Sequence, residues 1–369
     1  MNILIAANYA TPQSGNFIAS MVALNDALRQ QGDTLYFVFP DCPNTRREGS
    51  WVSWLQEEGC TVHLVQREQS EAARLQELQE IIREHRINVL HIHFAMYQDL
   101  ILTHRKALPV KIVVHDHADF AADKPLIRQK AYNLLLSLRY RLKGIGMISV
   151  SARRNSSYRF CKHWHVPNGL SRRRHVAHSR TREECREALG IRPEDRVCLF
   201  LGWALRLKGL DIACKAIGQL RQHDPQLVLA IVGVGNPPTE KAQTFLRTQA
   251  GVDPQAPWIR YLPDAEDMFA YHRMADVYLS ASRTEGFSYG VLEAIAENTP
   301  VAFSDIPGTR WAQAYDHGFM YPVEDPAACA QALSQALAAG RSASNAAQMV
   351  EAYSIDLWCQ RMIGIYRSL

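Results

Sequence analysis

Two glutamates stand eight residues apart in the stretch Arg283-Thr-Glu285-Gly286-Phe287-Ser288-Tyr289-Gly290-Val291-Leu-Glu293. Glu285 lies in a glycine-containing loop, and Glu293 falls about two turns into a helix predicted over 288–297. Backbone N–H groups at a helix start bind anions, and Gly286 and Gly290 allow a diphosphate to approach the main chain closely. A carboxylate inside such a helix can accept hydrogen bonds from the vicinal hydroxyls of a ribose. The alternative, a capping glutamate and a solvated one, is weakened because loop, glycines, helix and preceding strand coincide.

A second loop combines glycine with cations. It reads Gly202-Trp203-Ala-Leu-Arg206-Leu-Lys208-Gly209 and directly follows a strand predicted over 197–201. Lysine offers phosphate a point charge, and arginine offers a planar fork. Two solvated surface cations explain the segment alone equally well. The Walker spacing of a P-loop is absent.

Histidines end two neighbouring predicted strands. His91 and His93 end one strand, and His115, Asp116 and His117 end the next. Alternate strand residues share a face, so either His-x-His pair could chelate a metal. Polar residues satisfied at strand ends, or one histidine near a sugar hydroxyl, explain the pattern as well. A Gly-x-Ser-x-Gly elbow is absent, so Ser-His-Asp hydrolysis is unsupported.

Two further strand-to-helix loops carry glycines. One is Ser14-Gly15-Asn16-Phe17 and the other Gly233-Val-Gly235. Neither contains Gly-x-Gly-x-x-Gly, so a dinucleotide site is poorly supported, and a tight turn explains the second loop equally well.

The elements that position these residues alternate between strand and helix. Apolar runs predict strands at 3–7, 34–39, 62–65, 89–93, 111–115 and 147–151, and again at 197–201, 227–232, 259–262, 277–280 and 300–303. Amphipathic helices separate them, which is typical of doubly wound parallel sheets. We therefore expect an α/β protein with two Rossmann-like domains facing across a cleft. The first spans 1–170 plus a returning helix at 354–369, and the second spans 171–353.

Composition bounds the class of protein. The 369 residues are 47% hydrophobic and 21% charged, as in a folded soluble protein, and no run is long and apolar enough to cross a membrane. The N-terminus resembles a first strand and lacks the basic start of a signal peptide. Eight scattered cysteines without a Cys-x-x-Cys pair predict reduced thiols in a cytoplasmic protein.

The net charge of +4 is unevenly distributed. Thirteen Lys or Arg and no Asp or Glu occur from Lys124 to Arg174. The accompanying leucines of 126–138 favour docking on an anionic membrane or binding of a polyisoprenyl diphosphate, whereas a solvated basic face is the plain alternative.

Together these motifs resemble the family 4 retaining glycosyltransferases of the GT-B fold. The resemblance follows almost the whole chain in order: the Gly15 loop, His115-Asp116, Val166-Pro-Asn168-Gly169, Gly202 to Gly209, Val232 to Gly235, Ala275-Asp276-Val and Glu285 to Glu293. It implies a sugar transferase that uses a nucleotide diphosphate sugar.

The resemblance also implies roles by position. Lys208 and Arg206 would bind the diphosphate, Glu285 the donor sugar, and His115 would reach the sugar near its reacting carbon. The donor would further contact Gly15, Asn16, Gly202, Gly235, Gly286, Phe287, Ser288, Tyr289, Gly290, Val291 and Glu293, with Glu293 on the ribose. We expect His93, Asp116, His117 and Asn168 to face the acceptor.

Three positions depart from the family pattern. Trp203 occupies the usual arginine position, so Arg206 is assigned the guanidinium role, and Ser288 and Ser14 replace glycines. No Asp-x-Asp sequence occurs, and we expect neither a metal nor another cofactor.

The predicted reaction transfers a hexose or N-acetylhexosamine, with UDP expected in preference to GDP. The acceptor would be a glycan or a polyisoprenyl-diphosphate-linked sugar in bacterial cell-surface polysaccharide or glycolipid synthesis. The protein would be cytoplasmic, peripheral on the inner face of the membrane, and without a nucleic-acid partner. Two alternatives stay open: a nucleotide-sugar 2-epimerase on the same fold, and a non-catalytic transferase-like partner subunit.

Overall fold

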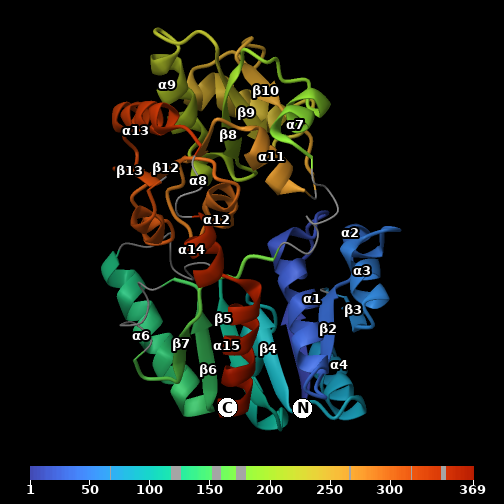
Figure 1. Ribbon diagram of the computed structural model, residues 1–369. Helices are drawn as coiled ribbons and strands as arrows, with labels where there is room; N and C mark the ends of the chain where they lie inside the picture. The colour runs from blue at the N-terminus through green and yellow to red at the C-terminus, as the bar shows by residue number, and fades with distance from the viewer. Residues whose placement is uncertain are drawn as a thin grey trace. The chain divides into compact units, whose positions relative to one another are not determined.

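The computed structural model describes residues 1–66, 68–117, 126–151, 159–171, 180–265, 267–316, 318–341 and 346–369. The chain forms two compact units, Met1–Ser171 with Tyr353–Leu369 and Arg172–Ala352 (Figure 1). Both boundaries lie one residue from those expected from the sequence. Six cations of the basic run, Lys124, Arg153, Arg154 and Arg172 to Arg174, lie outside the described residues.

A seven-stranded sheet organises the first unit, in the order β3-β2-β1-β4-β5-β6-β7 with every pair parallel. The strand order reverses between β1 and β4, which makes this the topological switch point where ligands of such sheets bind. The strands are β1 Asn2–Ala7, β2 Thr34–Pro40, β3 Thr61–Val65, β4 Val89–His93, β5 Lys111–Asp116, β6 Ile145–Ser149 and β7 His163–His165.

Helices cover both faces of this sheet because alternate strand residues point to opposite sides. Ile3, Ile5 and Phe37 pack under α1 (Gly15–Arg29) and α15 (Ile355–Ser368), which lie side by side in Figure 1. Leu4 and Val38 pack on the other face. The helices of that second face are α4 (Glu71–Glu84), α5 (Gln98–Thr103) and α6 (Leu126–Lys143). The short elements are α2 (Pro43–Arg46), α3 (Trp51–Glu57) and η1 (Arg105–Ala107).

The second unit has a six-stranded parallel sheet in the order β10-β9-β8-β11-β12-β13. Its order reverses between β8 and β11, so these two strands flank the switch point. The strands are β8 Arg196–Leu201, β9 Leu227–Val232, β10 Ile259–Tyr261, β11 Val277–Ser280, β12 Val301–Ser304 and β13 Gly318–Tyr321.

Its helices alternate with these strands around a single large apolar cluster. They are α7 Arg182–Ala188, α8 Leu205–Lys208, α9 Leu210–Leu220, α10 Glu240–Phe245, η3 Leu246–Ala250, α11 Met268–Met274, α12 Tyr289–Ala296, η4 Arg310–Ala314, α13 Pro326–Ala339 and α14 Ala346–Ala352. The expected two-domain α/β class is therefore confirmed.

The sequence reading missed two edge strands and one irregular helix. β7 and β13 are only three and four residues long, too short to show a period. The helix expected over 239–249 is α-helical only to Phe245 and continues as a π-helix, whose wider turns the 3.6-residue period cannot reveal.

Within the described residues, no helix is long and apolar enough to cross a membrane. All eight cysteines are free, and six of them are buried. Burial raises the pKa of the Cys60 thiol to about 12, as it does for Cys214, so these thiols stay protonated and inert.

Candidate functional site

The loop that leaves β8 is pressed against the loop that leaves β11. Gly209 has a φ of 77°, and a Cβ added there would lie 2.1 Å from the carbonyl oxygen of Ala281. Only glycine therefore allows the two loops to touch. The single turn α8 ends at Lys208, which places the lysine at the junction.

Lys208 and Glu285 form an ion pair across this junction. Ser282 Oγ donates a second hydrogen bond to Glu285 Oε1 at 2.8 Å. Both charged side chains stay partly accessible, at 22% and 16%. The structure thus brings together a cation suited to phosphate and a carboxylate suited to sugar hydroxyls, directly at the switch point of the sheet.

Glu293 lies on α12 and is 5% exposed. The imidazole of His272, on α11, is 3.2 Å from Glu293 Oε2 and orients the carboxylate. Tyr278 of β11 is packed near both glutamates; burial and their negative charges raise the pKa of its hydroxyl, which stays protonated.

The first turn of α12 is held tightly in place. A Cβ at Gly290 would lie 2.3 Å from Tyr278 Oη, so glycine is required there. The Ser288 amide donates to the Gly308 carbonyl at 3.1 Å, and the buried Phe287 stacks on Trp311 with ring centroids 4.8 Å apart. Val291 is fully buried beneath the turn. Gly286 and Tyr289 flank these contacts and remain predicted donor contacts.

Arg283 joins the two loops and was not singled out from the sequence. Its guanidinium forms a fork on Asp211 at 3.0 and 2.8 Å, binds Glu324 at 2.7 Å and donates to the Arg206 carbonyl. Its backbone N–H donates to the Leu207 carbonyl at 2.8 Å. Arg283 directly precedes the Thr-Glu pair of the motif, but only the fold reveals that its partners lie 72 and 41 residues away.

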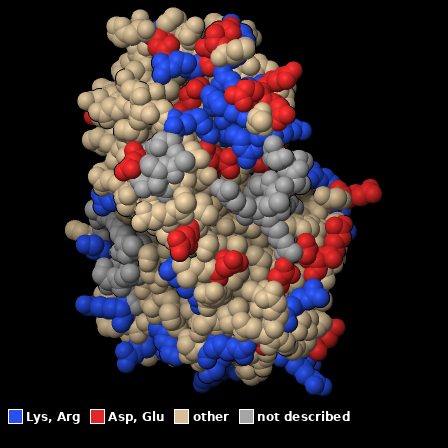
Figure 2. All heavy atoms as spheres, viewed as in Figure 1, with Lys and Arg blue, Asp and Glu red and all other residues tan. Residues whose placement is uncertain are grey.

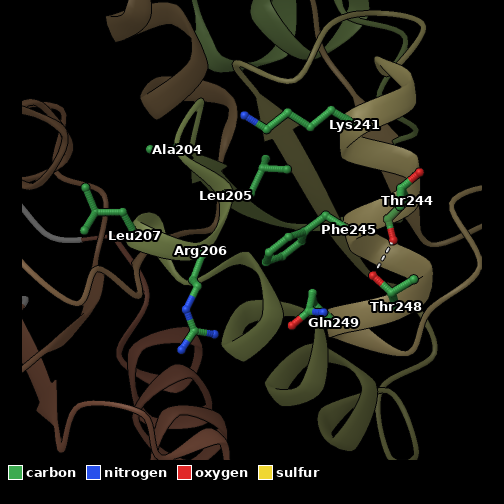
Figure 3. A pocket seen from close by; sticks show the side chains of 9 residues that line it. All are labelled: Ala204, Leu205, Arg206, Leu207, Lys241, Thr244, Phe245, Thr248 and Gln249. Atoms are coloured by element: carbon green, nitrogen blue, oxygen red, sulfur yellow. Dashed lines mark hydrogen bonds between the residues drawn. The ribbon is translucent and has the colours of Figure 1, made fainter.

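Arg206 points away from this junction. Its exposed side chain lines a pocket of about 420 Å³ with Lys241 and Phe245, formed between α8 and the α10–η3 helix (Figure 3). Gly202 packs against Phe200, and Gly233 lies under the Trp203 backbone. Gly235 has a φ of 89° in the same turn. Trp203, at the position of the displaced arginine, is 75% exposed.

The first unit gathers its predicted residues at the other switch point, between β1 and β4. Gly15, with a φ of 53°, begins α1, and Tyr9 Oη donates to the Ser14 carbonyl at 2.9 Å. Asn16 follows in the first turn. Phe17 packs edge-on against His93 and His117.

A histidine cluster lies beneath α1 and α15. Tyr366 Oη is 2.7 Å from His91 Nδ1, His93 Nε2 is 3.3 Å from His91 Nδ1, and His93 Nδ1 is 2.7 Å from His117 Nε2. His115 is 1% exposed and stacks on His117. Burial lowers the pKa of all four imidazoles, that of His117 to about 3, so they are neutral at physiological pH. Asp116 and Asn168, also expected near the acceptor, are buried.

Nitrogens of His91, His93 and His115 lie within 4.8 Å of one another and are a candidate metal group. Nitrogens on one tetrahedral zinc are separated by about 3.3 Å, given zinc–nitrogen bonds of about 2.05 Å. Most of the described contacts instead join the rings to each other and to Tyr366. The arrangement is that of a hydrogen-bonded chain of neutral rings.

Beside this cluster, residues 94–97 form a strained turn missed by the sequence reading. Phe94, Ala95 and Tyr97 have φ values of 51°, 58° and 57°, which side chains rarely adopt. Ala95 and Tyr97 line a pocket of about 270 Å³ with Asn8, Gln66 and Arg74. Tyr97 Oη and Arg74 Nε are buried there without a hydrogen-bond partner among the described residues. Such backbone strain often marks a binding site.

We expect Glu293→Gln to keep the fold and weaken binding of a free nucleoside diphosphate about 10- to 100-fold, because a hydroxyl loses a charged acceptor worth about 1.5–3 kcal/mol. Isothermal titration calorimetry measures this change. Glu187→Gln, on the exposed face of α7, is the matched control. Unchanged affinity in Glu293→Gln would remove this residue from the site.

Residues 181–352 match the family of "Glycosyl transferases group 1". A D-inositol 3-phosphate glycosyltransferase of Corynebacterium urealyticum is 30% identical over 200 residues, covering 52% of this chain and 47% of that protein. A GDP-mannose-dependent alpha-(1-6)-phosphatidylinositol monomannoside mannosyltransferase of Mycolicibacterium smegmatis is 35% identical over 146 residues, covering 37% of each chain. The chain spans about half or less of the length of these curated relatives.

Solved structures resemble the chain over its whole length. A glycosyltransferase of Rickettsia africae superposes with a TM-score of 0.77 at 17% identity, covering 100% of this chain and 98% of that one. Anabaena HepE in complex with UDP gives 0.74 at 15%, covering 100% of both. By its group 1 domain and its fold, the chain belongs to the family 4 glycosyltransferases of the GT-B fold.

Proposed function

We propose that this protein is a retaining glycosyltransferase that takes a hexose or N-acetylhexosamine from a nucleotide diphosphate sugar. The observation that supports this most strongly is the junction of Lys208, Glu285 and Glu293 at the β8–β11 switch point. One cation and two carboxylates at the carboxyl ends of parallel strands match a ligand with a diphosphate, a sugar and a ribose.

In this proposal each group has one task. Glu293, oriented by His272, accepts the ribose hydroxyls, and Glu285 accepts hydroxyls of the donor sugar. Lys208 stabilises the charge that develops on the departing diphosphate, and we propose that no metal is needed for this step. The acceptor hydroxyl attacks from the face that the diphosphate leaves and gives its proton to a diphosphate oxygen. His115, neutral because it is buried, donates or accepts a hydrogen bond near the reacting carbon without carrying charge.

UDP is the first donor nucleotide to test, since HepE was solved with UDP and with UDP-glucose. The mannosyltransferase relative is named for GDP-mannose, which makes GDP the second. A panel of UDP- and GDP-sugars should contain at least one that raises the melting temperature, because ligand that binds only the folded state stabilises it. A panel without any stabilising member would contradict the proposal.

We propose a glycan or polyisoprenyl-diphosphate-linked sugar as the acceptor, bound by the first unit. The polar pocket beside the strained turn supports this, because Tyr97 Oη and Arg74 Nε lie buried in it without partners. An acceptor of cell-surface polysaccharide or glycolipid synthesis would supply hydroxyl or phosphate oxygens for both groups.

We expect Tyr97→Phe to leave the melting temperature unchanged and to raise the acceptor KM about fivefold or more, because one hydrogen bond of about 1 kcal/mol is lost on binding. Initial rates at varied acceptor concentration measure it, and the donor KM is the internal control. Tyr36→Phe, on the neighbouring strand β2, is the matched substitution. An unchanged acceptor KM would place the acceptor elsewhere.

Two alternatives make different predictions. A 2-epimerase would convert a UDP-sugar without any acceptor, so turnover that is independent of acceptor favours it. A non-catalytic partner subunit would show no heat on titration with nucleotides. The ion pair of Lys208 with Glu285 and the buried Glu293 favour a functional donor site.

A further inference from the structure

Helix α6 carries an apolar stripe that faces away from the fold. Of the seven large hydrophobic side chains exposed among the described residues, five belong to α6. Ile127, Leu135, Leu138 and Leu142 are 83%, 62%, 40% and 76% exposed. Their spacings of 8, 3 and 4 residues place them on one narrow face of a helix with 3.6 residues per turn.

The opposite face of α6 already serves the core. Leu136 and Tyr140 are buried in the cluster over β4 and β5, and Tyr140 Oη accepts a hydrogen bond from Gln98 at 2.9 Å. Asn133 and Ser137 are buried on the same side. The stripe is therefore a second apolar surface, which the packing of the first unit does not use.

Cations flank the stripe. Arg128, Lys130, Arg139, Arg141 and Lys143 are all exposed, and the helix contains no Asp or Glu. None of the five forms an ion pair within the part of the chain that the structure describes. Blue side chains follow the position of α6 at the left margin of Figure 2. On a helical projection, Lys130 and Arg141 fall on one side of the stripe, and Arg128, Arg139 and Lys143 on the other.

We propose that α6 binds the surface of an anionic lipid bilayer, with its leucine and isoleucine side chains inserted among the acyl chains and its cations at the headgroups. A narrow exposed apolar stripe between two rows of cations matches the boundary between acyl chains and anionic headgroups. An acidic protein surface would match the cations but would leave exposed side chains such as Ile127 and Leu142 without an apolar partner. This proposal goes beyond the transfer reaction and does not depend on the donor site.

Cosedimentation of the full chain with vesicles tests the proposal. Vesicles of phosphatidylcholine alone are compared with vesicles in which phosphatidylglycerol replaces about a third of it, at low and at high salt. We expect sedimentation only with the anionic vesicles, and much less of it at high salt. Equal binding to neutral vesicles, or none to anionic ones at low salt, would overturn the proposal.

Two variants separate charge from insertion. The charge variant combines Lys130→Glu, Arg139→Glu, Arg141→Glu and Lys143→Glu, and should lower partitioning about 100-fold or more. Its control reverses four exposed cations off α6, Arg47, Arg83, Lys111 and Arg247, for the same change in net charge. An equal loss in the control would show a general charge effect and overturn the assignment to α6.

The apolar variant replaces Ile127, Leu135, Leu138 and Leu142 by glutamine, which keeps the charge and suits a helix. We expect it to lose sedimentation while its melting temperature and nucleotide binding stay at the wild-type level. A lower melting temperature would show that these side chains pack within the fold. A wild-type dimer in light scattering that this variant dissociates would assign the stripe to a second copy of the chain. Either outcome overturns the proposal and leaves the donor site untouched.

Discussion

Lys208→Met is expected to lower kcat/KM about 100- to 1,000-fold, the usual loss when one group that stabilises transition-state charge is removed. Lys208 is the cation that the structure places directly against Glu285 at the β8–β11 switch point. Steady-state rates with the stabilising donor measure the loss. Lys215→Met, on the exposed face of α9, removes the same charge from the same unit and should retain full activity.

Arg206→Ala provides the sharper comparison, because the sequence assigns both cations to the diphosphate. Arg206 lines the pocket beside α10, whereas Lys208 faces Glu285 (Figure 3). We expect Arg206→Ala to cost less than about fivefold, since an exposed cation contributes about 1 kcal/mol or less. Equal losses in the two variants would show that Arg206 turns toward the donor, and full activity in both would remove the diphosphate from this loop.

A double variant tests whether the ion pair acts as a unit. Lys208→Met leaves the Glu285 carboxylate beside Ser282 without its cation. Adding Glu285→Gln removes that charge, so stability should recover while activity stays low. Additive losses in stability would show that the two side chains do not interact, because only interacting neighbours depart from additivity.

The sequence predicted the regular elements because long strands and amphipathic helices carry their own period. β1, β4, β8 and β9 were each placed within about one residue. It also predicted which loops meet at each sheet edge, since parallel strands deliver their carboxyl ends together. The short edge strands β7 and β13 lack such a signal.

The side-chain contacts of the site were harder to predict because they join residues distant in the chain. His272 lies 21 residues before Glu293, and nothing local in its helix indicates the pairing. The leucines of α6 were the reverse case. The sequence could not separate Leu136, which is buried, from Leu135, which is exposed, until the neighbours of the helix were known.

Arg283 is the second residue whose replacement should have a large effect, through position rather than contact with the donor. Its fork on Asp211, its bond to Glu324 and its two links to the Arg206–Leu207 backbone fix the loop that carries Lys208. The side chain is 16% exposed, and that of Asp211 is 10% exposed. Arg283→Met leaves Asp211 partly buried without a partner, at a cost of about 3 kcal/mol. For a unit of this size, the melting temperature should fall by about 6–12 °C.

The effect of Arg283 on position can be separated from its effect on stability. Combining Arg283→Met with Asp211→Leu removes the unpaired charge, so the melting temperature should return toward the wild-type value. We expect kcat/KM to stay at least about tenfold low, because the loop that holds Lys208 has lost its clamp and small displacements are costly in catalysis. Arg310→Met breaks a more exposed pair with Asp305 and should change stability by about 1 kcal/mol or less. If activity recovers together with stability in the double variant, Arg283 only holds the fold. If activity stays low while the melting temperature recovers, the arginine positions the lysine on which the transfer step depends.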